Sequence, residues 1–221
     1  MDIYEAIKKR RDVRSWFDSR HVPEPILAKI LLAGHYAPSV GYSQPWNFIL
    51  IKDNDTRMKI KKLVEAARSE FSSTIGPDKR KLFEDIKVEG IMESDLNIAV
   101  TCDFDRAGPD IIGRSTIRET SEYSTVLAIE NMWLAARSEN IGIGWISFFN
   151  PEDVKKILGI PENIKLVAYL ALGYLRENHE IPELEEKGWR MRENLSKLVY
   201  RENWGNSIEK RLSETINRMD I

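Results

Sequence analysis

The run KLVAYLALGYL, residues 165–175, constrains the fold more than any other stretch of this sequence. It is mostly apolar, which is typical of a strand buried in the middle of a sheet. It is also far too short to span a bilayer. Three further segments have the apolar, β-rich composition of strands, at residues 47–53, 96–103 and 143–149. We therefore expect a sheet with residues 165–175 as a central strand.

Amphipathic segments between these strands predict helices, at residues 2–10, 25–36, 55–71, about 80–87, 119–140 and 150–159. Asp2 and Asn150 stand where N-caps are expected, and Gly159 stands near a C-cap. The mixture, with some strands following one another directly, favours an α+β fold over a doubly wound sheet. Residues 119–140 are the most apolar helix, so they belong in a core or in a subunit interface.

The chain has 221 residues, a length that suits one domain with a sizeable core or one domain plus an extension, and its formal net charge is −2. We expect the core at residues 1–174 and a polar extension of the same domain at residues 175–221. The balanced charge gives no sign of nucleic-acid or membrane-surface binding. A single cysteine, Cys102, excludes an intrachain disulfide and, with no signal-peptide pattern, favours the cytoplasm. The histidines are scattered, so no metal site is expected.

The stretch KKRRDVRSW places Asp12 among the basic residues Arg10, Arg11 and Arg14. Arginine guanidinium groups form planar forks that fit phosphate oxygens, so the cluster can hold a phosphate. It can equally be a solvated helix end, where basic residues are favoured by the helix dipole. The residues alone leave both interpretations open, and neither explains an acid beside an anion.

Three other stretches carry groups suited to a ligand, although each has an ordinary structural interpretation. The loop APSVGYSQPWNF, residues 37–48, offers Ser39, Gln44 and Asn47, or simply connects a helix to a strand. GIGWIS, residues 142–147, can lie against a flat ring or form a tight helix-to-strand turn. In GWRMRENLSKLVY, residues 188–200, Arg190 and Arg192 share one side of an extended chain, or are exposed arginines of no special role.

The ordered set of these motifs resembles the FMN-dependent nitroreductase family. RRDVRSW, APSVGYSQPWNF, NIAVTCD, GIGIGWIS, VAYLALGY and WRMR follow one another as in that family. The chain is more similar to one branch, the 5,6-dimethylbenzimidazole synthases of the BluB type. GR…ETSEYST, IENMWLAARSENIGIGWIS and WRMRENLSKLVYRENWGN are among the segments that carry this likeness, which covers residues 2–206.

The resemblance implies a central, mostly antiparallel sheet flanked by helices, with a C-terminal extension that embraces the partner subunit of a homodimer. Two FMN sites, each built from both chains, would lie at the interface. The phosphate would be held by Arg10, Arg11, Arg14, Arg190 and Arg192. The remaining implied cofactor-binding residues are Asp12, Val13, Pro38, Ser39, Val40, Gln44, Trp145 and Ile146.

In the branch that this chain resembles, reduced FMN is the substrate. With O2 it is fragmented to 5,6-dimethylbenzimidazole, the lower ligand of vitamin B12, and to erythrose 4-phosphate. The distinguishing residues of that branch correspond to Asp12, as a general acid–base, and Ser147. A lid in residues 71–95 or 104–118 would exclude water. NAD(P)H would be an indirect reductant, acting through a separate flavin reductase.

Alternatives remain open on the sequence. An NAD(P)H-dependent FMN nitroreductase or flavin reductase would consume nicotinamide with nitroarenes, and a deiodinase-like dehalogenase would need a lid motif that is not evident. An FMN-sequestering protein would show no turnover. The chain also departs from the synthase branch at Asp95, Ser121, Glu122 and Glu130, and it lacks the usual Leu-Pro after Arg192.

Overall fold

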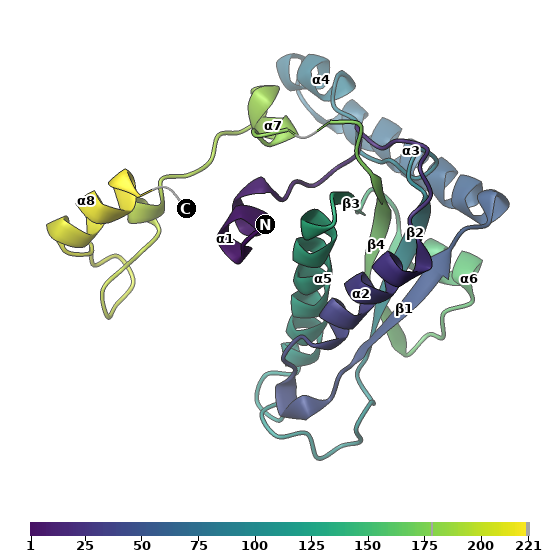
Figure 1. Ribbon diagram of the computed structural model, residues 1–221, viewed down its shortest axis with the longest axis horizontal. Helices are drawn as coiled ribbons and strands as arrows, with labels where there is room; N and C mark the ends of the chain where they lie inside the picture. Colours follow the sequence, from purple (N-terminus) through teal and green to yellow (C-terminus); the bar gives the residue numbers. More distant parts are fainter. Residues whose placement is uncertain (178, 220–221) are drawn as a thin grey trace. The chain divides into compact units, whose positions relative to one another are not determined.

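The computed structural model describes residues 1–177 and 179–219 (Figure 1). Asn178, Asp220 and Ile221, which fall in the expected extension, lie outside the described residues. The chain divides into two compact units, Met1–Glu180 and Ile181–Ile221. The helices of the first unit are α1 (Ile3–Lys9), α2 (Glu24–His35), η1 (Val40–Tyr42), α3 (Asn54–Thr74), α4 (Pro77–Glu84), α5 (Thr120–Ser138) and α6 (Pro151–Leu158).

The strands of the first unit form one antiparallel sheet in the order β1-β2-β4-β3. Their bounds are β1 (Trp46–Ile51), β2 (Leu96–Asp103), β3 (Ile141–Ile146) and β4 (Ile164–Tyr174). The expected central strand is confirmed, because β4 pairs with β2 on one side and with β3 on the other. Antiparallel pairing between β2, β4 and β3 confirms the α+β class.

Strand β3 begins two residues earlier than the sequence pattern predicted. Gly142 and Gly144 lie within the strand, so of the two interpretations of GIGWIS the tight helix-to-strand turn at these glycines is wrong. The turn is made instead by Asn140, whose φ of 59° places it in the left-handed region. Asparagine tolerates this conformation better than most residues, so the turn does not require the two glycines.

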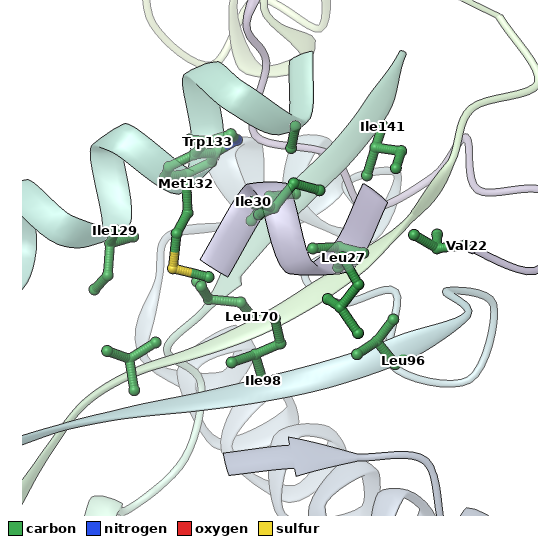
Figure 2. Packing of buried hydrophobic residues seen from close by; sticks show 14 of the residues in the cluster. Val22, Leu27, Ile30, Leu96, Ile98, Ile129, Met132, Trp133, Ile141 and Leu170 are labelled. Carbon is green, nitrogen blue, oxygen red and sulfur yellow. The ribbon is translucent and has the colours of Figure 1, made fainter. Parts of the chain in front are cut away.

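The main core lies between the sheet and the helices α2 and α5. Figure 2 shows Leu27 and Ile30 of α2 close to Ile98 and Leu170 of the sheet. The two helices approach closely, since a Cβ at Gly34 would lie 2.7 Å from a carbon of Met132. On α5, Ile129, Trp133 and Ala136 are buried. Val126 is 40% exposed and Leu127 47%, so α5 also presents an uncovered apolar face.

Arg57 of α3 fixes the irregular segment 86–95 before β2. Its Nε donates to the Ile91 carbonyl at 3.1 Å, and its Nη2 donates to the Ser94 carbonyl at 2.6 Å. Val88 and Ile91 of this segment are buried. Buried carbonyl groups without secondary-structure partners need such donors, and one guanidinium supplies several. The later part of the 71–95 region, which we considered as a lid, is therefore packed into the body of the unit.

The segment that carries Asp12 lies directly against β3. The Val13 N–H donates to the Ile143 carbonyl at 3.0 Å, within a parallel bridge between Asp12 and Ile143. A Cβ at Gly144 would lie 1.9 Å from the Val13 oxygen, which is far inside contact distance. Gly144 is thus required for this close backbone approach.

Two more contacts hold the same segment. The Trp133 Nε1–H donates to the Arg11 carbonyl at 3.1 Å, and a Cβ at Gly90 would lie 2.8 Å from the Arg14 oxygen. Strand β3, helix α5 and the segment held by Arg57 therefore set the position of residues 11–14 together.

The second unit contains α7 (Glu183–Glu186), η2 (Leu195–Lys197) and α8 (Lys210–Arg218). A bridge between Tyr200 and Ser207 closes a short loop, in which the rings of Tyr200 and Trp204 lie 4.7 Å apart. Among the described residues of the whole chain, no helix combines the length and the apolar composition needed to cross a membrane.

We expect Arg57→Met to lower the free energy of unfolding by about 2–4 kcal/mol, because several buried carbonyls lose their donor at once. Urea denaturation followed by tryptophan fluorescence measures this loss. Arg80→Met is the matched control, since Arg80 also donates to backbone carbonyls, of Ser72 and Ser73, but at the surface. Its loss is expected to stay below about 1 kcal/mol. Equal losses in both variants would contradict the anchoring role of Arg57.

Gly144→Ala should destabilise the protein by about 2 kcal/mol or more, because the new methyl group overlaps the Val13 carbonyl. Thermal unfolding measures the loss, and near-ultraviolet circular dichroism monitors the tryptophans around the segment. The control is Gly76→Ala, since Gly76 has a φ of −63° and open space around its Cβ position. We expect a change below about 1 kcal/mol for this control. If Gly144→Ala were as mild, the close approach would be wrong.

Candidate functional site

The carboxylate of Asp12 is held at both of its oxygens. The Trp145 N–H donates to Oδ1 at 2.8 Å, and the Arg14 guanidinium donates to Oδ2. The Asp12 side chain is 34% exposed, and the Asp12 backbone is paired with Ile143 of β3. The carboxylate therefore reaches the surface from a backbone that β3 holds in place. Burial raises the pKa of Asp12, although Arg14, the Trp145 N–H and Arg10 all act to lower it. The site therefore contains an acid that is oriented and has a raised pKa.

Arg10 lies at the C-cap of α1 and reaches helix α5. Its guanidinium stacks over the Trp133 ring at 4.9 Å, and its Nε lies 3.8 Å from Glu130 Oε1. This stacking orients the planar guanidinium and leaves it partly exposed. Sequence reasoning missed both partners, because they come from a helix that was assigned to the core or the interface. Glu130 had appeared only as a departure from the resembling branch.

Arg11 points the other way. Its Nη1 donates to the carbonyls of Lys8 and Arg10, each at 2.6 Å, and its Nη2 donates to the Glu180 carbonyl. Successive side chains of an extended segment alternate between its two sides. Asp12 and Arg14 accordingly share one side, and Arg11 lies with Val13 on the other.

The residues after Gly144 differ in what they can offer to a ligand. Trp145 is half-buried, with its ring 6.4 Å from that of Trp133. The Ile146 side chain is completely buried, so only its backbone can reach a ligand. Ser147 follows the end of β3 and is exposed. An extended backbone places Ser147 about 7 Å from Trp145 along the chain.

The loop at residues 37–48 is tightly folded around its own side chains. Ser39 Oγ accepts from the Gln44 N–H at 3.1 Å, and the Val40 N–H donates to Ser124 Oγ of α5 at 3.0 Å. Tyr42 and Gln44 both have positive φ values, 54° and 47°. The hydroxyl of Ser39 is thus used in shaping the turn. Pro38 is exposed, and Trp46 is buried in the core.

Helix α5 separates this loop from the Asp12 segment within one chain. The loop is bonded to Ser124 near the start of α5, whereas the Asp12 segment is bonded to Trp133. Nine residues of α-helix correspond to about 13 Å along its axis. The structure therefore brings Arg10, Asp12, Arg14 and Trp145 together, and places residues 38–44 as a separate group.

Arg190 and Arg192 belong to the second unit and are exposed. The Arg190 Nη2 lies 3.9 Å from Glu193 Oε1, a pair that is open to solvent. Among residues 1–177 and 179–219, no group of three or more histidine, cysteine, aspartate or glutamate side chains is placed to hold a metal ion.

A model described as the nitroreductase family matches residues 7–174. A protein of Rhodospirillum rubrum named 5,6-dimethylbenzimidazole synthase is 39% identical over 185 residues, covering 83% of this chain and 86% of that protein. A BluB-like flavoprotein of Clostridium difficile 630 has a similar fold, with a TM-score of 0.69, 22% identity, and coverage of 92% of this chain and 100% of that one.

A further solved structure with this fold is iodotyrosine deiodinase bound to FMN and 3-iodo-L-tyrosine. Its TM-score is 0.70 at 21% identity, with coverage of 91% of this chain and 99% of that one. The match to the family model extends over most of the chain, and the identity to the Rhodospirillum protein is well above 30%. The nitroreductase-like fold that the motifs implied is therefore confirmed, and this chain belongs to the nitroreductase family.

Proposed function

We propose that this protein is a 5,6-dimethylbenzimidazole synthase, which converts reduced FMN and O2 to 5,6-dimethylbenzimidazole and erythrose 4-phosphate. The observation that carries the proposal is the position of Asp12. Its carboxylate is fixed on the Trp145 N–H, between two partly exposed arginines. The relatives that bear the synthase name, at 29–39% identity over most of the chain, support the same activity.

The groups around Asp12 fit FMN. The side chains of Arg10 and Arg14 are partly exposed, and their planar guanidinium groups suit a phosphate dianion. Half-buried Trp145 near the end of β3 and exposed Ser147 just after it give a half-apolar surface that suits a flat ring. Reduced FMN would supply both the electrons for O2 and the carbon atoms of the product.

Asp12 cannot hold the phosphate, since two anions repel one another, so its task must be different. We assign it to proton transfer. When Arg14 turns toward a phosphate, Oδ2 loses its donor, while Oδ1 stays bonded to the Trp145 N–H. Oδ2 is then the atom that would carry a proton, and a raised pKa makes this carboxyl more effective near neutral pH. Ser147, exposed at the end of the strand, would donate a hydrogen bond to the flavin.

The phosphate is assigned to Arg10 and Arg14, with Arg190 and Arg192. Arg11 is a positioning residue in this proposal, because its guanidinium is occupied by the carbonyls of Lys8, Arg10 and Glu180. Val13 contributes through its backbone, which pairs with Ile143.

We further propose that the site is completed by a second copy of the chain. Within one chain the loop at residues 38–44 is a separate group from the Asp12 cluster, so Pro38, Ser39, Val40 and Gln44 would line the flavin held by the partner. Helix α5 exposes Tyr123, Val126 and Leu127, and α1 exposes Ile3, Tyr4 and Ile7. Such apolar faces on neighbouring helices are typical of subunit interfaces.

The proposed activity needs a supply of reduced FMN, and we assign that supply to a separate flavin reductase that uses NAD(P)H. A cytoplasmic location fits this arrangement. The one cysteine, Cys102, is buried and free, and burial raises the pKa of its thiol, so it is poorly suited to disulfide chemistry.

Asp12→Asn is expected to lower the yield of dimethylbenzimidazole by about 100-fold or more, because the proton-transferring group is lost. The protein is loaded with FMN, reduced under argon and exposed to air, and the product is measured by mass spectrometry. The fold should survive. A raised pKa means that the charged form of Asp12 costs stability above that pKa, so the asparagine should not lower the unfolding temperature at neutral pH.

The matched control is Asp18→Asn, which removes another arginine-bonded carboxylate six residues away. It should retain the wild-type yield.

Ser147→Ala should lower the yield by about tenfold, which is the contribution expected of one hydrogen bond. If the wild type simply reoxidised FMN and formed no dimethylbenzimidazole, the proposal would be wrong. Rapid oxidation of NAD(P)H with nitroarenes in that case would establish a nitroreductase instead.

Arg10→Met, Arg14→Met, Arg190→Met and Arg192→Met should each weaken FMN binding by about 10- to 100-fold, the range for a charge-assisted hydrogen bond. Riboflavin, which has no phosphate, should bind these variants as it binds the wild type. Quenching of flavin fluorescence measures both affinities. Arg11→Met should leave the preference for FMN over riboflavin unchanged, as should Arg20→Met. If Arg11→Met lost the preference for FMN over riboflavin, Arg11 would have to be assigned to the phosphate after all.

A further inference from the structure

A narrow pocket lies behind the Asp12 segment. Arg11 and Val13 line it, whereas Asp12 and Arg14 do not. Helix α5 contributes Trp133 and Arg137, and the first unit also contributes Lys9, Arg10 and His179. The pocket is therefore on the side of the segment opposite to the proposed proton-transferring group.

Arg137 is the feature of this pocket that requires explanation. It lies in the last turn of α5 and is 7% exposed. Its Nε and Nη1 are both buried, and neither has a hydrogen-bond acceptor in the part of the chain that the structure describes. A buried charge that is neither paired nor hydrogen-bonded is strongly unfavourable. Burial accordingly lowers the pKa of Arg137.

The other cations around the pocket are compensated by groups of their own. Lys9 bonds to Glu5 at 3.1 Å, Arg10 lies near Glu130 and on the Trp133 ring, and Arg11 is bonded to backbone carbonyls. The described residues that line the pocket include four lysine and arginine side chains and no carboxylate. Arg137 is thus left without a counter-charge in a strongly positive environment.

The size of the pocket limits what can supply that charge. The space inside the pocket holds about one water-sized sphere. A phosphate ester or a flavin does not fit. A neutral water molecule would satisfy a donor without compensating the charge. A monatomic anion does both.

We propose that this pocket binds a halide ion, which accepts hydrogen bonds from Nε and Nη1 of Arg137. The ion would pair the buried guanidinium and hold the positively charged segment around residues 9–11 against α5. Chloride is the halide that ordinary solutions contain, so we expect chloride to be the occupant. Arg10 lines this pocket and is also assigned to the FMN phosphate, but Arg137, which would bind the halide, has no part in the proposed flavin site. The inference therefore stands or falls independently of the proposed function.

Bromide is the probe, because it replaces chloride and scatters anomalously. The full chain is unfolded thermally in mixtures of sodium gluconate and sodium bromide at constant ionic strength. Wild-type Tm should rise saturably with bromide, by about 3 °C or more once bromide exceeds its Kd tenfold. Arg137→Met should lose this rise and, since it removes an unpaired charge, unfold in gluconate at the wild-type temperature or above.

Arg211→Met is the matched control, because it removes an exposed arginine from α8 and should keep the wild-type response. Crystals of the wild type soaked in bromide should show an anomalous peak beside Arg137. The proposal is overturned if all three proteins respond equally, if the pocket contains no peak, or if a carboxylate of a neighbouring chain occupies it. Should Arg137→Met fail to fold, the wild-type anomalous map decides alone.

Discussion

The close contact between the Val13 backbone and Gly144 is the constraint on which the rest of the site depends. A side chain at residue 144 would overlap the Val13 oxygen, so only glycine lets the segment pair with Ile143. Once that pairing exists, the next residue of β3, Trp145, places its N–H against Asp12, and no loop has to adopt a particular conformation for this hydrogen bond. Contacts from Trp133 and Gly90 then fix the carbonyls of Arg11 and Arg14. A site carried by an irregular segment is thereby positioned by rigid elements on three sides.

The same pairing divides the basic cluster into two groups with different surroundings. Alternation along the extended segment sends Asp12 and Arg14 to the outer side, and Arg11 and Val13 to the inner side. The outer group is partly exposed and open to a ligand, while Arg11 is bonded to the backbone. Asp12 orients Arg14 in the free protein. In the proposed function it would not weaken a phosphate clamp, because it would become the proton carrier when Arg14 turned to the phosphate.

The order of strands and helices could be predicted because apolar periodicity and capping residues are local signals. Asp2 forms a capping box with Glu5, Asn150 caps α6, and Gly159 ends α6 in the left-handed region, as the sequence indicates. The central position of residues 165–175 followed from their apolar run. Gly142 and Gly144 could not be assigned in this way, because a glycine suits a turn as well as a close approach. What distinguishes the two cases is a contact with Val13, about 130 residues away in the chain.

Long-range contacts also explain why the arginines could not be sorted from the sequence. Arg57 looks like a solvated residue of an amphipathic helix, yet it anchors a segment more than thirty residues away. Arg10 and Arg11 are neighbours of the same type, and only Trp133 and the carbonyl of Glu180 separate their roles. The candidate motif was visible in the sequence, but the division of labour within it depends on tertiary structure.

Asp95, Glu122 and Glu130, three of the departures from the resembling synthase branch, have side-chain partners within this chain. Asp95 accepts from the Val22 N–H and contacts His21, each at 3.0 Å, which ties the start of β2 to the segment before α2. Glu122 bonds to Lys165. Glu130 lies 3.8 Å from Arg10 in a pair that is largely open to solvent, and such pairs contribute little stability. A phosphate dianion offers Arg10 a stronger partner, so Glu130 can orient this arginine in the free protein without preventing it from binding a phosphate.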